Sequence, residues 1–232
     1  MITPFMEQYA VYEALNLDMP LYLQRRPKVV HPDNVMPVSQ IVKPFLCPSD
    51  RERAVEPGWG PTNYVACWGS GAGGGKKKDA DGVFYVNSQT RFADITDGTS
   101  NTAMFSEHTL GPGGPRARLT PKSARDVWVW ADGRWISDAS CARATRAYMD
   151  RGAKWADGMI SMSGYNHWYP PNAQTPDCQA RSSAWKAARS RHPGGVSLLL
   201  CDGSVRFVSD TVDLQIWRSL GSRNGGEVLG QF

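Results

Sequence analysis

The feature that most constrains the fold is a pair of apolar segments near the end of the chain, residues 196–201 and 204–208, joined by an Asp-Gly dipeptide. Asp-Gly is a strong signal for the two-residue turn of a β-hairpin, because both residues tolerate positive φ angles. That turn pairs Leu200 with Val205 and places alternate side chains of both strands on one face. The predicted buried face consists of Val196, Leu198, Leu200, Val205 and Phe207. We therefore expect an antiparallel hairpin with one face in the core.

The rest of the sequence predicts short elements between long loops. Residues 2–16 carry apolar side chains at helical spacing, and residues 63–68 have the pattern of a strand. A second short helix follows the hairpin, where Asp210 or Thr211 can cap its start and Gly221 ends it.

Turn-forming residues indicate a loop-rich protein. The 232 residues include 23 Gly and 16 Pro, and Asp-Gly occurs five times, which favours tight turns between short antiparallel strands. No shift in composition marks a domain boundary, so we expect one domain over residues 1–232 with a loop-rich insertion at about 108–185. The predicted class is α+β, with an antiparallel β-sheet, short helices and many long loops.

Charge and hydropathy exclude several classes of partner. The formal net charge is +4, with acidic and basic residues mixed along the chain, so we expect no nucleic-acid partner and no binding to a membrane surface. The longest purely apolar run, residues 198–201, is far shorter than the roughly 20 residues of a spanning helix.

No motif for catalysis is present, and we expect a protein that is not an enzyme. The four histidines, at positions 31, 108, 167 and 192, have no nucleophile and carboxylate at a recognisable spacing. No Cys/His pattern has zinc-finger spacing. Asp94 and Asp97 lie in an oxygen-rich stretch that could bind calcium, although Asp-Gly with Ser, Thr and Asn is also ordinary turn chemistry. Apart from this calcium hypothesis we expect no cofactor.

His192 precedes Asp202-Gly203 by nine intervening residues, and the first strand of the predicted hairpin lies between them. The two side chains should therefore be about 20 Å apart, at opposite ends of that strand. This distance argues against a catalytic His–Asp pair. We interpret His192 as fixing the loop that enters the hairpin, and Asp202 as forming its turn.

The same spacing resembles the His-x9-Asp-Gly signature of a large bacterial family of prepilin-type proteins. That family is catalogued as a domain of unknown function and is often labelled type II secretion G-like. Its signature residues here are His192, Asp202 and Gly203, in a structural role. Other blocks that are similar to the family follow in order at residues 3–16, 45–50, 62–64, 94–102, 170–178 and 192–230. The resemblance extends over nearly the whole chain.

The resemblance implies a parent protein with an export leader, a prepilin peptidase and methylation motif, a long apolar N-terminal helix and a pilin-like head. We expect this chain to be the head, with the leader and helix missing, and to lie outside the cytoplasm in the cell envelope. The implied function is that of a pseudopilin-like structural subunit of a type II secretion or pilus-like assembly. Its partners would be other pilin-like subunits or envelope assembly proteins, with membrane contact only through the missing helix.

An alternative function is carbohydrate binding at the surface by exposed aromatic side chains. The insertion carries six tryptophans that could form such a surface or could instead be core residues. They are Trp128, Trp130, Trp135, Trp155, Trp168 and Trp185.

Five widely spaced cysteines in a loop-rich chain fit an oxidising compartment. Cys141 and Cys178 are the preferred disulfide, because both lie in the insertion and could staple it. Spacing alone does not determine connectivity. Cys47 could instead pair with Cys201 or with a cysteine in the missing helix.

Overall fold

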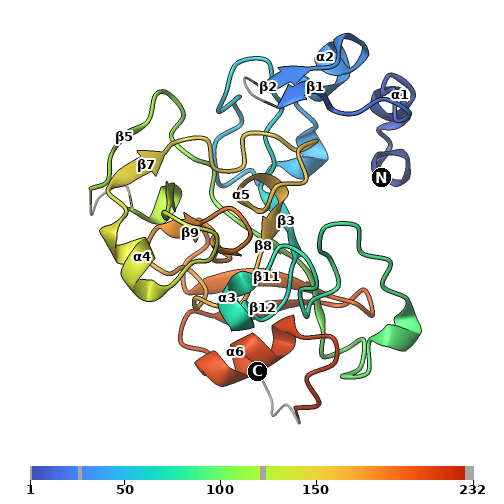
Figure 1. Cartoon of the computed structure of the whole chain (residues 1–232). Coiled ribbons are helices and arrows are strands. Elements are labelled where there is room, and N and C mark those ends of the chain that lie inside the picture. The colour runs from blue at the N-terminus through green and yellow to red at the C-terminus, as the bar shows by residue number, and fades with distance from the viewer. Residues whose placement is uncertain (1, 26–27, 121–123, 228–232) are drawn as a thin grey trace.

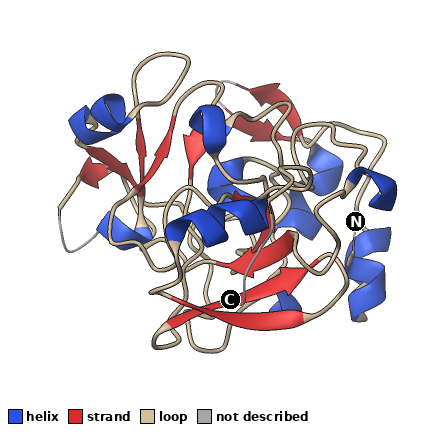
Figure 2. Ribbon diagram, turned by 90° about the horizontal axis from the view of Figure 1, so that it is seen from below, coloured by secondary structure: helices blue, strands red, loops and turns tan. Residues whose placement is uncertain are grey.

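The computed structural model describes residues 2–25, 28–120 and 124–227, and its class is α+β (Figure 1). Loops take much of the length (Figure 2). The strands are β1 (Tyr22–Arg25), β2 (Lys28–Val30), β3 (Tyr64–Cys67), β4 (Ala103–Glu107), β5 (Ala117–Arg118), β6 (Trp128–Trp130), β7 (Arg146–Tyr148), β8 (Gly164–Tyr165), β9 (Asp177–Gln179), β10 (Ala184–Trp185), β11 (Gly195–Leu200) and β12 (Val205–Ser209). The α-helices are α1 (Tyr9–Glu13), α2 (Pro32–Val38), α3 (Ala72–Gly75), α4 (Asp138–Arg143), α5 (Ile160–Ser163) and α6 (Leu214–Gly221), and the 3-10 helices are η1 (Thr3–Met6), η2 (Lys43–Phe45), η3 (Phe92–Asp94) and η4 (Ala124–Asp126).

Five strands in the order β12-β11-β4-β3-β8 form what we call the main sheet. Its pairs are antiparallel except for β3 with β8. Helix α6 covers one face, and Asp213 caps that helix by accepting hydrogen bonds from two backbone amides of its first turn. The predicted helix is confirmed, but its cap is neither Asp210 nor Thr211. The core between the helix and the sheet consists of Val65, Cys67, Ala103, Tyr165, Ala188, Val196, Leu198, Leu200, Val208, Trp217 and Leu220.

The predicted hairpin is present as β11 and β12, but its register was wrong by one residue. Leu199, not Leu200, lies opposite Val205. The amide of Leu200 donates to the carbonyl oxygen of Ser204, which leaves a loop of three residues, 201–203. This loop ends in Gly203 with φ 87°, the left-handed position that such loops assign to glycine. A shift of one residue moves a strand's side chains to the other face. Val205 and Phe207 are therefore exposed by 67% and 56% instead of lying in the core.

The N-terminal segment also differs from prediction. Residues 2–16 form two short helices, η1 and α1, instead of one, because the backbone turns left-handed at Glu7 with φ 57°. The strand expected at residues 63–68 is confirmed as β3. No helix in the described ranges is both long and apolar enough to span a membrane.

The region expected to be an irregular insertion builds a second sheet, in the order β10-β9-β6-β7-β5. Its strands have two or three residues each, so no alternating pattern could reveal them in the sequence. Cys141 of α4 and Cys178 of β9, the pair preferred from the sequence, form a disulfide beside this sheet. Cys47 and Cys201, the alternative pair, are free thiols.

A buried charge cluster links the second sheet to the main sheet. Asp177 of β9 forms ion pairs with Arg151 and Arg189, and both guanidinium groups are fully buried. The backbone amide of Arg189 donates to the carbonyl oxygen of Glu107, the last residue of β4. The cluster therefore holds β9 close to the end of a main-sheet strand.

Candidate functional site

The second face of the main sheet carries an apolar hollow of about 780 Å³. Alternate strand residues point to opposite faces, so β3 sends Val65 to the core and Tyr64 and Ala66 to the hollow. Phe105 of β4 and Leu199 of β11 lie beside them. The remaining described lining residues are Ile2, Thr3, Met6, Pro44, Phe45, Thr62, Met104, Ser106, Trp155, Ala156, Ser163, Ser197 and Val205. Because none of these side chains is charged, the hollow is suited to an apolar occupant.

A polar cluster of Cys47, Glu107 and His192 lies close to residues that line the hollow. Glu107 ends β4, directly after the lining residue Ser106, and Cys47 follows η2. His192 Nε2 lies 3.5 Å from Cys47 Sγ and 3.7 Å from Glu107 Oε2. Cys47 and Glu107 are buried, whereas the His192 side chain is 39% exposed. A thiol, a carboxylate and an imidazole thus face one another, and the imidazole alone is partly exposed at the protein surface.

Backbone contacts orient the three side chains. Glu107 Oε1 accepts a hydrogen bond of 2.6 Å from the backbone amide of Ser197, which leaves Oε2 directed toward His192. The amide of Cys47 donates to Asn63 Oδ1 at 3.0 Å. The amide of His192 donates to Ser190 Oγ at 3.1 Å. Each of the three residues is therefore anchored separately.

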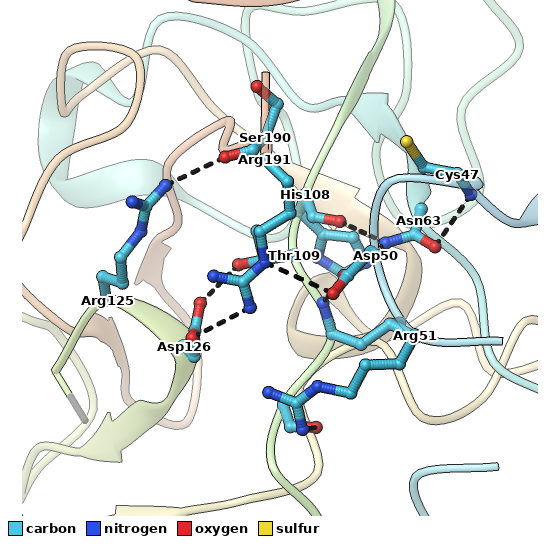
Figure 3. A network of polar contacts seen from close by, with 12 residues as sticks. Cys47, Asp50, Arg51, Asn63, His108, Thr109, Arg125, Asp126, Ser190 and Arg191 are labelled. Carbon is cyan, nitrogen blue, oxygen red and sulfur yellow. Dashed lines mark hydrogen bonds and ion pairs between the residues drawn. The ribbon is translucent and has the colours of Figure 1, made fainter. Parts of the chain in front are cut away.

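A second layer of polar contacts joins the loops that carry Cys47 and His192 (Figure 3). Asp50 accepts a hydrogen bond from Asn63 at 2.9 Å and pairs with Arg191 at 3.3 Å. Arg191 also pairs with Asp126 at 3.0 Å. Burial opposes ionisation of Asp126, but the hydrogen bond from Thr109 and the charge of Arg191 outweigh it and lower the pKa of that carboxyl. These contacts hold residues 47–50 close to residues 190–192.

The signature residues His192 and Asp202 lie apart, as expected from the strand between them. His192 precedes β11 and Asp202 follows it, so the two residues lie at opposite ends of that strand. Asp202 Oδ1 accepts hydrogen bonds from the amide and hydroxyl of Ser204, which fits the turn role inferred for it. Gly203 supplies the left-handed turn position.

The two candidate calcium ligands have partners within the chain. Asp94 caps η3 and pairs with Arg91 at 3.0 Å. Asp97 accepts hydrogen bonds from the backbone amides of Gly225 and Gly226 at 2.7 and 2.8 Å. Both carboxylates thus have structural roles in the folded chain, and calcium binding by them stays a prediction.

Within the described residues, Cys47, Glu107 and His192 are the group whose ligand atoms could surround a metal ion, since all three atoms lie within 4.8 Å of one another. The sequence alone does not reveal this group, because 60 positions separate the first two residues and 85 separate the last two. Cys47 and His192 lie in two of the sequence blocks that we expected to be similar to a known family, residues 45–50 and 192–230. This similarity was the one sequence signal that pointed to Cys47 and His192, and no such signal pointed to Glu107.

Comparison with known protein families matches residues 1–215 to a family described as "Protein of unknown function (DUF1559)". No curated protein and no solved structure matches the chain.

Proposed function

The chain belongs to the protein family of unknown function DUF1559, and we propose that it is the head of a non-catalytic, pseudopilin-like structural subunit of the cell envelope. Its partners are other pilin-like subunits or envelope assembly proteins. The single observation that carries this proposal is the uncharged hollow on the second face of the main sheet.

The hollow fits an apolar helix better than a polar ligand. Its lining has aromatic and aliphatic side chains from three neighbouring strands, represented by Tyr64, Phe105 and Leu199. Burying such surface is favourable by about 25 cal/mol per Å². The volume of about 780 Å³ equals that of about two turns of a helix some 10 Å wide.

The position of the first described residues supports the apolar N-terminal helix of the parent polypeptide as the occupant. Ile2, Thr3 and Met6 all line the hollow, so the N-terminal end of the chain lies against it. Phe5, in the same turn, is 88% exposed. A helix that enters from this end would cover the sheet face and anchor the head at the membrane.

The disulfide supports a location outside the cytoplasm. Cys141 and Cys178 are bonded, and structural disulfides persist mainly in oxidising compartments. This agrees with a head that faces the periplasm or the exterior.

Carbohydrate binding has narrower support. Of the six tryptophans in the insertion, Trp128 and Trp185 are buried, whereas Trp130 and Trp135 are 39% and 48% exposed. Neither of these two residues lines the hollow. Trp155 is the one of the six that lines the hollow, where its neighbours are uncharged, so the sheet face favours assembly over sugar recognition.

The proposal is tested by following the natural polypeptide in its own cells, with and without an active prepilin peptidase. We expect a processed, membrane-anchored protein that loses its processing when the peptidase is inactive. Alkylation of the denatured protein should leave Cys141 and Cys178 unmodified until a reductant is added, because these two cysteines are bonded. A soluble cytoplasmic protein in which Cys141 and Cys178 react without reductant would contradict the proposal.

A further inference from the structure

We propose that Cys47, Glu107 and His192 bind one zinc ion, a property beyond the structural role proposed above. Thiolate sulfur, imidazole nitrogen and carboxylate oxygen are the three donor types that zinc takes from proteins. The thiolate selects against calcium and magnesium, which prefer oxygen donors alone. Three protein ligands leave the fourth tetrahedral position open to water.

The spacing of the donor atoms suits a tetrahedral ion. With bonds of about 2.0 to 2.3 Å, neighbouring ligand atoms of a tetrahedral zinc lie about 3.3 to 3.6 Å apart. His192 Nε2 is 3.5 Å from Cys47 Sγ and 3.7 Å from Glu107 Oε2. The remaining separation, between Cys47 and Glu107, is within 4.8 Å. A small movement of side chains therefore completes the site.

The charges also favour a divalent cation. Glu107 is 3% exposed, and its carboxylate, the buried thiol of Cys47 and the His192 ring lie within 4.8 Å of one another. Carboxylates at such burial are normally paired or bound to a metal. A thiolate and a carboxylate carry two negative charges in total, which a divalent ion with neutral imidazole balances.

The ligands are already oriented by other groups. The amide of Ser197 holds Glu107 Oε1, so the second oxygen is directed toward the cluster. Asn63 ties the Cys47 backbone to Asp50, which in turn pairs with Arg191 next to His192. Contacts of this kind, which orient the residues that bind a metal ion, typically strengthen metal binding tenfold or more. The partly exposed His192 ring gives an ion access from solvent.

The test is titration of the chelator-treated chain with Zn²⁺ by calorimetry and with Co²⁺ by absorption spectroscopy, without reductant so that the disulfide stays intact. We expect one equivalent of zinc and a thiolate-to-cobalt charge-transfer band. Cys47→Ser should abolish the band, and Glu107→Gln and His192→Gln should each weaken zinc binding at least tenfold. Cys201→Ser, which removes a free thiol at the other end of β11, is the matched control and should bind like the unaltered chain.

Thermal unfolding of each variant without metal separates ligand loss from misfolding. His192→Gln is the decisive variant because its side chain is 39% exposed and its removal should leave the fold intact. Failure of the unaltered chain to bind zinc would overturn the proposal. So would zinc binding of normal affinity in a folded Cys47→Ser or His192→Gln variant, since the ion would then lie elsewhere.

Discussion

The disulfide between Cys141 and Cys178 offers a prediction whose size follows from the structure. It closes a loop with a sequence separation of 37 residues. In the chain-entropy treatment, a loop of this length restricts the unfolded chain by about 4 kcal/mol at 25 °C. With an unfolding entropy of about 2.1 cal/mol/K per residue, a chain of 232 residues should lose about 8 °C in Tm without the bond.

The assay compares urea and thermal unfolding of the unaltered chain with a Cys141→Ala/Cys178→Ala variant. Cys178 is buried, so part of any loss could come from a cavity. Cys67→Ala is the packing control, because Cys67 is fully buried in the main-sheet core and forms no disulfide. We expect the double variant to lose several kcal/mol more than the control. Equal losses would refute the idea that loop closure stabilises the second sheet.

Three further predictions concern single residues. Asp177→Asn should lower the free energy of unfolding in urea by about 3 to 5 kcal/mol, because it leaves the buried Arg151 and Arg189 without their carboxylate. Asp94→Asn, which removes a more exposed ion pair, is the control, and an equally small loss in both variants would contradict the prediction. Burial lowers the pKa of His167 to about 3, so the unfolded chain takes up a proton below pH ~6.5 that the folded chain does not, and stability should fall as the pH drops from there toward 3. His167→Gln should reduce this dependence without abolishing it, because burial also lowers the pKa of His108, and an unchanged slope would show that His167 does not contribute. Gly203→Ala should cost about 1 to 2 kcal/mol of stability, because φ is 87° there. The added methyl group meets no atom within 4 Å, so a steric clash does not contribute to this cost. Gly158→Ala, with equally open space and no positive φ, should lose less, and equal losses would argue against a backbone origin.

Some of the fold could be predicted from the sequence, because the apolar pattern extends over enough residues to distinguish a strand from a helix. The hairpin and α6 were found in place, since their apolar positions repeat over many residues. The register was not found, because Asp-Gly fits the last two positions of a three-residue loop as well as a two-residue turn. The second sheet was invisible, because strands of two or three residues show no period.

The candidate site could be predicted only in fragments. Cys47 and His192 lay in recognisable segments, but Glu107 lies at the end of an ordinary-looking strand, and only the pairing of β3, β4 and β11 brings it to the other two. The hollow was not predicted because of the same register error. Val205 was assigned to the core, and a one-residue shift places it on the open face instead.

The most direct test of the central claim is photo-crosslinking in the natural polypeptide within its own envelope, with a photoreactive residue in place of Leu199 in the hollow. A probe at Trp135, which is 48% exposed and outside the hollow, is the control. We predict that the Leu199 probe crosslinks to an apolar N-terminal helix of the same polypeptide and that the Trp135 probe does not. A Leu199 probe that reaches no such helix, or reaches it no more often than the control, would contradict the proposal that this chain is a pseudopilin-like head.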